Sequence, residues 1–393
     1  MSADSAGRKM VDWLAVQRDA MINMLRRIVD IDSGSYNKRG IDEVGAVISE
    51  FLASNGVEIE VIPQHLHGDC IRATVPATDL RSHNTGNVLL MGHRDTVFPD
   101  GEAIRRPFTI RDGLGYGPGV MDMKAGLVMN CFVLAAFAKL GGGPMPLVGL
   151  FTGDEEIGSP EGRPVIEAEG RKARAVLNSE PARLSGNVVT GRKGGVFSRF
   201  RIAGKAAHSG LNFGDGISAI EELALKIHAF HELTDVAAGI TVNVGLVSGG
   251  QSVNTVAPWA EGQIDLRFIH GQQRDDVMER IERIVQHSFV PSTNAVLTIN
   301  GEFVPLVQTP EAKQLFVAYA QAAADTGFHC EGEFAGSCAD SGFTAAVGAP
   351  TLCCVGPDGH GGHTAEEYVR LDTLVPRAQA CVRTVMALGH AES

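Results

Sequence analysis

Five residues of types that bind divalent metal ions are spread along the chain, each inside its own short motif. They are two histidines and three carboxylates: His93, Asp122, Glu156, Glu180 and His363. Each lies at the end of an apolar, strand-like run or beside a Gly-rich loop, which is where an α/β sheet presents its chemistry. Nitrogen and oxygen ligands of this kind suit a pair of zinc-like ions. The neighbouring Glu155 is free to act as a base.

The strongest of these motifs is a run of three acids, Asp154, Glu155 and Glu156, directly after the apolar run 147–151. Adjacent acids at the end of a buried strand are costly unless cations or water neutralise them. A metal would keep Glu156 an anion, whereas Glu155 can have a raised pKa and carry protons. The competing interpretation is a solvated acidic turn.

The motifs around His93 and Asp122 also allow more than one interpretation. His93 and Asp95 are two residues apart on extended backbone, so Asp95 can accept the N–H of an imidazole that binds metal. A turn with a surface histidine is the alternative. Asp122 follows a Gly-rich loop and could bridge two metals, or it could only cap the helix that follows.

Other histidines compete for the role of ligand. His360 stands three residues before His363, and the family resemblance described below favours His363. His65 and His67 form a His-x-His pair, but no acids stand near it in the pattern. We therefore expect both to be surface residues.

Apolar runs and helical periodicity alternate in the first half of the chain, which predicts a largely parallel sheet covered by helices on both faces. After about residue 191 the order becomes βαββαβ, as in a ferredoxin-like domain. The first pattern then resumes. We expect an α/β catalytic domain formed by 1–190 and 300–393, interrupted by an inserted α+β domain at 191–299. The expected strands are 57–62, 70–75, 87–91, 146–151, 173–177, 196–202, 240–247, 260–269, 295–299 and 350–354, and the expected helices are 10–30, 45–54, 123–140, 214–233, 273–288, 311–326 and 371–388.

Composition narrows the class of protein. The 393 residues carry a formal net charge of −12, which argues against a nucleic-acid or anionic-membrane partner. The seven cysteines are odd in number and include no Cys-x-x-Cys pair, as expected for reduced, mostly buried thiols in a cytoplasmic protein. The N-terminus lacks the apolar core of a signal peptide. The longest apolar run, 125–138, contains Asn130 and is too short to span a bilayer.

The five motifs, in this order, resemble the di-zinc metallopeptidase family of glutamate carboxypeptidase, acetylornithine deacetylase, succinyl-diaminopimelate desuccinylase and peptidase T. The resemblance runs from about residue 20 to the end, and the stretch 336–368 is most similar to the glutamate carboxypeptidase branch. It implies two Zn²⁺ per chain, with Co²⁺ or Mn²⁺ as possible replacements. The implied roles are His93 and Glu180 on one zinc, Glu156 and His363 on the other, Asp122 as the bridge, Glu155 as general acid/base and Asp95 as support for His93. The peptide bond after Asp122 is often cis in this family.

The resemblance also implies roles for the inserted domain as lid and dimerisation domain. His208 would steady the oxyanion, commonly across a dimer interface; the alternative is an ordinary loop histidine. Arg267 alternates with core residues along a strand, so it faces away from the core and could bind a substrate carboxylate or pair with Asp265. Asn254 is similar to the family's substrate-binding asparagine. Gly336 is a further substrate-binding candidate, although Gly-Ser-Cys-Ala at 336–339 replaces the family's more usual glycine-rich run.

Together these features predict a cytoplasmic, homodimeric di-zinc hydrolase that cleaves a small peptide or an N-acyl amino acid. The released amino acid would have a free α-carboxylate, bound by Arg267 and Asn254. An N-acyl-amino-acid deacylase on the same scaffold is the alternative. A non-catalytic homologue fits less well, because Glu155 and all five ligand candidates are present.

Overall fold

The computed structural model describes residues 3–78 and 86–389, which form two compact units. The first unit comprises the described residues of 1–191, 306–335 and 339–393, and the second comprises Arg192–Pro305 with the loop Gly336–Cys338. The chain thus leaves the first unit, builds the second and returns. The predicted roles of the second unit as lid and dimerisation domain stay predictions.

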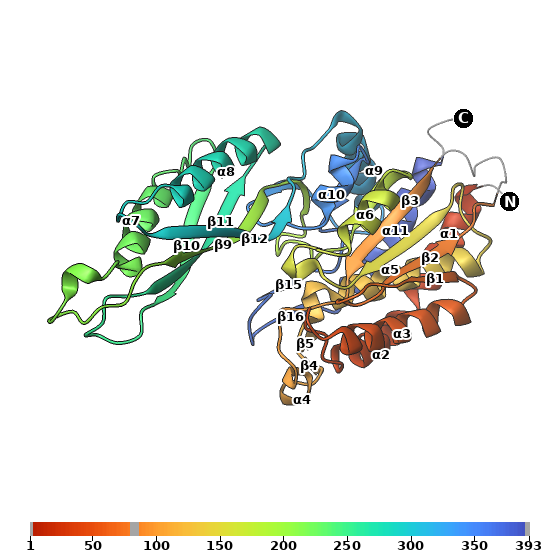
Figure 1. Cartoon of the computed structure of the whole chain (residues 1–393). Helices are drawn as coiled ribbons and strands as arrows, with labels where there is room; N and C mark the ends of the chain where they lie inside the picture. Colours follow the sequence, from red (N-terminus) through yellow and green to blue (C-terminus); the bar gives the residue numbers. More distant parts are fainter. Residues whose placement is uncertain (1–2, 79–85, 390–393) are drawn as a thin grey trace. The chain divides into compact units, whose positions relative to one another are not determined.

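A large mixed sheet forms the centre of the first unit (Figure 1). β3 pairs in parallel with β6 on one side and with β7 on the other, and β14 is parallel to β7. β1 and β2 add an antiparallel edge. The prediction of a mainly parallel α/β sheet is therefore confirmed. In order across the sheet, the strands are β1 (Glu58–Ile62), β2 (Cys70–Val75), β6 (Leu147–Thr152), β3 (Asn87–His93), β7 (Ala173–Asn178), β14 (Thr351–Cys353), β8 (Val188–Arg192) and β13 (Gly332–Ala335).

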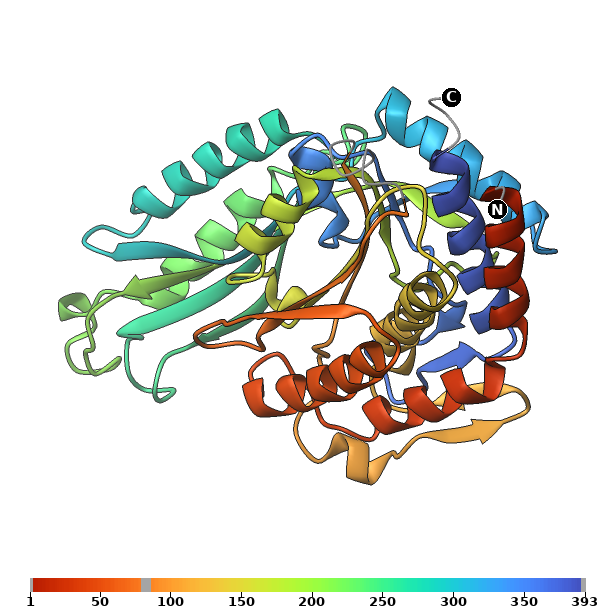
Figure 2. The same cartoon turned by 90° about the vertical axis from the view of Figure 1, so that its right-hand side faces the viewer.

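Helices cover both faces of this sheet (Figure 2). The helix α5 (Ala125–Lys139) contacts β2, β3 and β6, and outer helices pack on it in turn. Its apolar residues surround the whole helix, as expected for a helix buried on every side. The outer helices of this layer are α1 (Ala3–Ala15), α2 (Arg18–Val29), α3 (Lys38–Ser54) and α11 (Leu374–Leu388), while α6 (Arg163–Gly170) and α10 (Ser341–Ala346) cover the other face and α9 (Pro310–Ala324) contacts α11 and β14.

The expectation about the longest apolar run needs a correction. Together with the turn before it, the helical stretch Val120–Lys139 is 20 residues long, so its length and composition alone would allow it to cross a membrane. However, 89% of its apolar window is buried inside the structure. Its polar Asn130 is satisfied there, because Nδ2 donates to Met91 O and Oδ1 accepts from Ser179 Oγ. It is a core helix of the first unit.

Several short elements were not predicted from sequence. The expected helix 10–30 is two helices, because the chain turns at Val16 and Gln17 between α1 and α2. Elements of two to eight residues are too short to show a clear period in the sequence. They are α4 (Glu102–Arg105), α6, α10, β8, β13 and a separate sheet of β15 (Gly359–His360), β16 (Tyr368–Arg370), β5 (Leu114–Tyr116) and β4 (Thr109–Arg111).

The second unit has the expected βαββαβ order. Its antiparallel sheet has the order β10-β11-β9-β12, so β10 and β12 are the edges. Alternate residues of β11 are buried, as predicted for Ile264, Leu266 and Phe268. The elements are β9 (Gly194–Ala203), α7 (Ala219–His231), β10 (Thr241–Gly249), β11 (Trp259–Phe268), α8 (Gly271–Gln286) and β12 (Asn294–Phe303).

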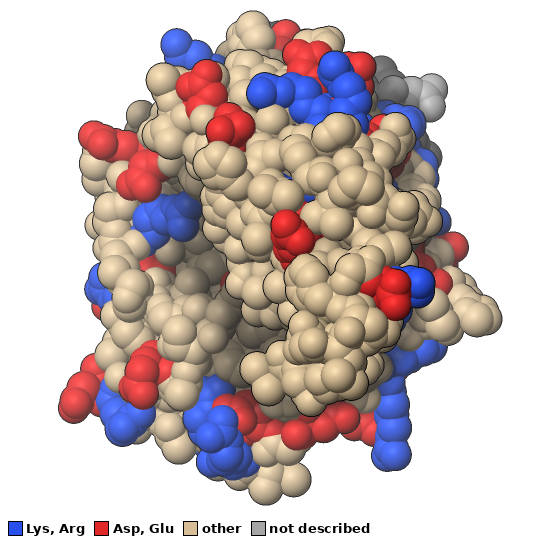
Figure 3. Space-filling model, turned by 60° about the vertical axis from the view of Figure 1, so that its left-hand side comes forward, with Lys and Arg blue, Asp and Glu red and all other residues tan. Residues whose placement is uncertain are grey.

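The cysteines agree with the expectation of mostly buried thiols. All seven cysteines are free thiols, and every one except the half-buried Cys338 is buried. On the face shown in Figure 3, basic and acidic side chains are interspersed between wide uncharged areas, without a broad basic surface.

Candidate metal centre

Three neighbouring parallel strands bring most of the candidate ligands to one edge of the main sheet. β3 ends at His93, β6 ends just before the turn with Glu155 and Glu156, and β7 ends just before Glu180. Because β6, β3 and β7 are adjacent and parallel, their carboxyl ends meet at the same edge. Residues almost ninety positions apart in sequence therefore become neighbours.

All five ligand candidates meet in two groups, each with donor atoms within 4.8 Å of one another. One group is His93, Asp122 and Glu180, and the other is Asp122, Glu156 and His363. Asp122 belongs to both groups. Its Oδ1 lies 3.3 Å from His93 Nε2, and its Oδ2 lies 3.3 Å from His363 Nε2. The remaining contacts are His93 Nε2 to Glu180 Oε1 at 3.7 Å and His363 Nε2 to Glu156 Oε2 at 3.3 Å.

The residues present fit divalent cations. His93 Nε2 and Glu156 Oε1 are buried, and neither has a hydrogen-bond partner among the described residues. Unsatisfied buried polar atoms are costly, so their presence here needs an explanation. Cations on the two groups would use both atoms as ligands and would also neutralise the excess of carboxylates.

A buried glutamate holds the loop that carries Asp122. Asp122 lies in an irregular helical turn, Val120–Lys124, and its peptide bond to Met123 is cis. Lys124 is the N-cap of α5, so the alternative that Asp122 only caps that helix is wrong. The carboxylate of Glu367 accepts the backbone N–H groups of Gly119, Met121 and Asp122 at 2.8–3.0 Å. Burial raises the pKa of Glu367 to about 7.

Asp95 connects His93 to the acidic turn. His93 Nδ1 lies 3.0 Å from the main-chain oxygen of Asp95 and 3.4 Å from its Oδ1, so the closer acceptor is the backbone and not the predicted carboxylate. The Asp95 carboxylate accepts the backbone N–H groups of Glu155 and Glu156, both at 3.1 Å, and the hydroxyl of Ser35 at 2.7 Å. It therefore fixes the turn as well as the imidazole.

The three adjacent acids have different surroundings. Asp154 turns away from the metal-binding groups and accepts the backbone N–H groups of Glu161 and Gly162 at 2.8 and 2.9 Å. Glu155 is buried, with Oε2 3.9 Å from His93 Nε2. Burial raises the pKa of Glu155 well above its usual range. A buried carboxyl group with a raised pKa holds a proton more readily than an exposed one, which suits a proton carrier.

A second unpredicted contact supports the same turn. Ser159 Oγ donates to Asp340 Oδ1 at 2.5 Å, and both residues are buried. The two lie 181 positions apart, so no local pattern could have paired them. Glu367 and Ser35 were missed for the same reason, although Glu367 stands four residues after His363 in a segment already singled out.

The positions of the competing histidines distinguish the ligand candidate from the others. His363 is in a metal-binding group, whereas His360 is exposed and lies beside the ring of Tyr368. His65 is exposed, as expected. The same expectation is wrong for His67, which is buried with Nδ1 2.8 Å from Glu161 Oε2. The sequence did not reveal this partner, because Glu161 is 94 positions away.

Two substrate-side candidates, His208 and Asn254, lie together in exposed loops of the second unit. Ser209 N donates to Asn254 O at 3.0 Å, and His208 forms a β-bridge with Thr255. His208 Nδ1 accepts the backbone N–H groups of Gly210 and Leu211, each at 3.2 Å. In the neutral ring, Nε2 therefore carries the hydrogen and can donate it.

Arg267 lies at the other end of β11. Its Nε and Nη2 donate to Asp265 at 2.6 and 3.0 Å, and Nη1 donates to Cys338 Sγ at 2.7 Å. The predicted alternative, a pair with Asp265, is therefore present. A side chain at Gly336, in the same loop as Cys338, would meet nothing within 4 Å, so close packing does not require glycine there.

Asn254 and Arg267 belong to opposite ends of β11. Asn254 precedes Trp259 at the start of β11, and eight further residues lead to Arg267, which spans about 26 Å on an extended strand. The expectation that both residues bind the same α-carboxylate stays a prediction, and a second copy of the chain would be the way to bring the two ends of β11 to one substrate.

Comparisons with known proteins agree with this geometry. The sequence model described as "Peptidase family M20/M25/M40" matches residues 89–387. Carboxypeptidase G2 from Pseudomonas sp. (strain RS-16) is 25% identical over 382 residues, covering 95% of this chain and 90% of that protein. Acetylornithine deacetylase from Pasteurella multocida (strain Pm70) is 31% identical over 255 residues, covering 60% of this chain and 63% of that protein.

Solved structures share the whole fold. An M20 family metallo-carboxypeptidase, Sso-CP2, from Sulfolobus solfataricus has a TM-score of 0.79 at 19% identity, covering 94% of this chain and 99% of that one. The dipeptidase Dug1p from Saccharomyces cerevisiae has a TM-score of 0.76 at 17% identity, covering 100% and 99%.

The fold and site define the class of a metal-dependent peptidase or amidohydrolase. The chain belongs to peptidase family M20/M25/M40.

Proposed function

We propose that the protein binds two divalent ions, Zn²⁺ foremost, and hydrolyses an amide bond to release an amino acid with a free α-carboxylate. The observation that carries this proposal is Asp122, whose two oxygens each face the imidazole of a different ligand group. His93 and Glu180 would hold one ion, Glu156 and His363 the other, and Asp122 both. When bound, the ions would polarise the substrate carbonyl and make water a better nucleophile.

Glu155 is the proposed general acid/base. Its burial and raised pKa suit a group that takes a proton from the attacking water and later returns it to the leaving nitrogen. Asp95 holds the backbone of Glu155 and the ring of His93 at once, so it positions the base relative to the proposed ligands.

Arg267 is the proposed partner of the substrate carboxylate. Asp265 and Cys338 take three of the five guanidinium N–H groups, which fixes the plane of the guanidinium and leaves one N–H each on Nη1 and Nη2. Such a pre-oriented pair of donors matches a carboxylate. Similarity to carboxypeptidase G2 over 95% of the chain favours a carboxypeptidase-like activity.

We further propose that His208 and Asn254 act on a substrate bound to a second copy of the chain. Within one chain, the start of β11 beside their loops lies about 26 Å along the strand from Arg267, far more than the length of an amino acid. In a homodimer, Arg267 of one copy and His208 and Asn254 of the other copy could contact the same substrate. The edge strand β10 carries exposed Leu246 and Val247, which are apolar enough for a contact between copies.

Subunit mixing tests this arrangement. Glu155→Gln and His208→Ala chains, each expected to be about tenfold or more below the wild type alone, are unfolded and refolded together in equal amounts. If His208 acts across the interface, half of the dimers are mixed and each has one complete site, which restores about a quarter of the wild-type activity. If His208 acts within its own chain, mixing restores nothing.

The acylase-like alternative is favoured by the similarity to acetylornithine deacetylase. A panel of dipeptides, N-acetyl amino acids and aroyl-glutamates, assayed with the Zn²⁺-loaded protein and with chelator, separates the two activities. Release of amino acids from dipeptides or aroyl-glutamates supports the carboxypeptidase-like function, and turnover restricted to N-acetyl amino acids supports the deacylase. No metal-dependent release from any member would contradict both.

A further inference from the structure

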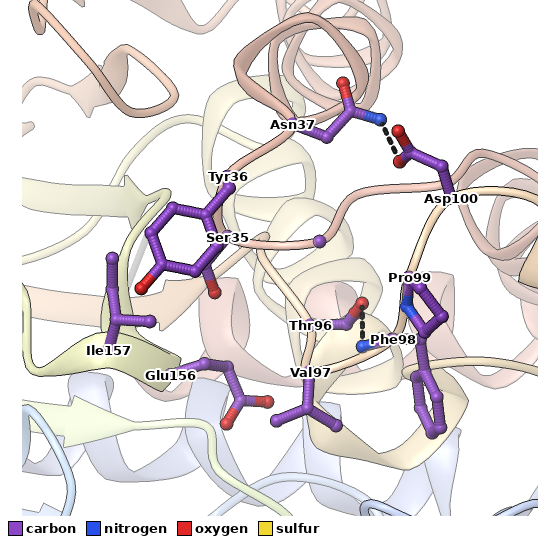
Figure 4. A pocket seen from close by; sticks show the side chains of 11 residues that line it. Ser35, Tyr36, Asn37, Thr96, Val97, Phe98, Pro99, Asp100, Glu156 and Ile157 are labelled. Carbon is purple, nitrogen blue, oxygen red and sulfur yellow. Dashed lines mark hydrogen bonds between the residues drawn. The ribbon is translucent and has the colours of Figure 1, made fainter. Parts of the chain in front are cut away.

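A cavity of about 480 Å³ opens in the first unit beside the turn that carries Glu156 (Figure 4). Its walls come from the loops 34–37 and 96–100 and from Glu156 and Ile157. The volume is typical of a small-molecule site. Because Glu156 belongs both to the cavity and to a metal-binding group, a ligand in this cavity would lie directly beside the proposed reaction centre.

The floor of the cavity is pre-formed. Ser35 N donates to Thr96 O at 3.3 Å, and Thr96 N donates to Ser33 O at 2.9 Å, so the two loops are paired like short strands. A Cβ on Gly34 would come within 2.6 Å of Phe98 O, so only glycine allows this close approach. Ser35 also donates to Asp95, which links the floor to the catalytic turn.

The walls are largely apolar and carry exposed side chains. Tyr36 is 84% exposed and Val97 is 43% exposed. In Figure 4, Tyr36 and Ile157 lie on one side of the cavity, and Val97 and Pro99 lie on the other. An apolar ligand between these walls would remove apolar surface from water on both of its faces.

The charged side chains of the lining disfavour an anionic ligand. Among the residues that line the cavity, Asp100 and Glu156 carry formal charge, and none is Lys, Arg or His. The carboxylate of Asp100 accepts a hydrogen bond from Asn37 Nδ2 at 2.7 Å, which leaves its charge in place. With the proposed ion on Glu156, a carboxylate deeper in the cavity would still meet the negative charge of Asp100 and no cationic side chain.

We propose that this cavity binds an uncharged acyl group with an apolar face, on the carbonyl side of the scissile amide, and that Tyr36 and Val97 set the selectivity for it. This inference rests on the proposed function. The leaving amino acid has an α-carboxylate that needs a cationic partner, so the leaving side does not fit this lining. The acyl group is the other part of the substrate, so we place it in this cavity. The negative charge of Asp100 disfavours acidic acyl groups there.

The test uses three amides of one amino acid, chosen as the residue that the enzyme releases fastest. The first has an acetyl group, which is small. The second has a benzoyl group, which is flat and apolar, and the third has a succinyl group, which is anionic. For the wild type, kcat/KM is expected to be highest for benzoyl and lowest for succinyl. Tyr36→Ala is expected to lower the benzoyl-to-acetyl ratio of kcat/KM by about tenfold. Val97→Lys is expected to raise the succinyl-to-acetyl ratio by about tenfold, because it adds the missing cation.

Ile110→Ala is the matched control, because Ile110 is 44% exposed in the same unit but does not line this cavity. It should leave all ratios within about twofold of the wild type. If the wild type cleaves these amides and both Tyr36→Ala and Val97→Lys also stay within that range, the inference is overturned while the proposed function stands. If metal-loaded wild type cleaves no amide at all, the proposed function itself has failed. Tyr36 is mostly exposed, so Tyr36→Ala should fold and its ratio alone decides the inference if Val97→Lys does not fold.

Discussion

The metal-ligand candidates meet within one chain, whereas the substrate-binding candidates of the second unit are spread along it. In the first unit, five distant residues meet in two groups of donor atoms, and buried partners such as Asp95 and Glu367 hold them. In the second unit, His208 and Asn254 are exposed and lie far along β11 from Arg267. Metal ligands must be fixed before the ion binds, so one folded unit provides them all. Substrate contacts can be completed by another copy.

The largest expected effect concerns Glu155, the proposed base beside the metal-ligand candidates of the first unit. Glu155→Gln should lower kcat by about a hundredfold or more, because the attacking water loses its proton acceptor. Metal content, measured by inductively coupled plasma mass spectrometry, should stay at the wild-type level because Glu155 is not a proposed ligand. Near-normal turnover would show that the base is another residue.

His208→Ala tests, by the same two measurements, the exposed loops of the second unit. Loss of its Nε2 donor should lower kcat by about ten- to a hundredfold, while both ions are retained. If the metal content falls instead, His208 is a ligand and the contrast between the two regions is wrong. Asn212, which also contacts the His208 backbone through its Oδ1, serves as a control: Asn212→Ala should change kcat far less.

The hydrogen bonds that hold the Asp122 loop can be weakened without replacing a proposed metal ligand. Glu367→Gln has one acceptor oxygen where Glu367 has two, and it loses the negative charge that holds three backbone N–H groups. We expect about tenfold weaker metal binding, measured by competition with a fluorescent chelator. A change in KM with unaltered metal affinity would place Glu367 on the substrate side.

The smallest effect concerns a buried ion pair that belongs to the second unit alone. Lys226 Nζ lies 2.9 Å from Glu222 Oε1, and both side chains are inaccessible to solvent. Burial opposes ionisation of Glu222, but hydrogen bonds from Lys226, Val290 and Phe289 outweigh it and lower its pKa. This stabilisation is present above the unfolded pKa of a glutamate and is lost as pH falls through the lower folded value.

Glu222→Gln should therefore lower the free energy of unfolding by about 1.5 kcal/mol at neutral pH, with a smaller difference from the wild type in acid. Urea unfolding at several pH values measures it. Metal content should not change, because the pair lies outside the first unit. A difference that grows in acid would contradict the assigned direction of the pKa.

The parts of the fold that sequence predicted are those with a long period or a long apolar run. β3, β6 and β7 and the order of the second unit fall in this class. Three ligand candidates were found because they follow such strands, and Asp122 and His363 because they stand in Gly-rich motifs. The contacts of Ser159 with Asp340, of Glu367 with the Asp122 loop and of His67 with Glu161 join residues far apart in sequence, and only the folded chain brings them together. The separation of Arg267 from Asn254 was missed because each motif was interpreted without its position along the sheet.

Anomalous diffraction from crystals soaked with Zn²⁺ tests the central claim most directly. Two peaks per chain are predicted, one among His93, Asp122 and Glu180 and the other among Asp122, Glu156 and His363, and both should vanish in Asp122→Ala. A single peak, or peaks that survive the loss of Asp122, would contradict the proposed two-ion site.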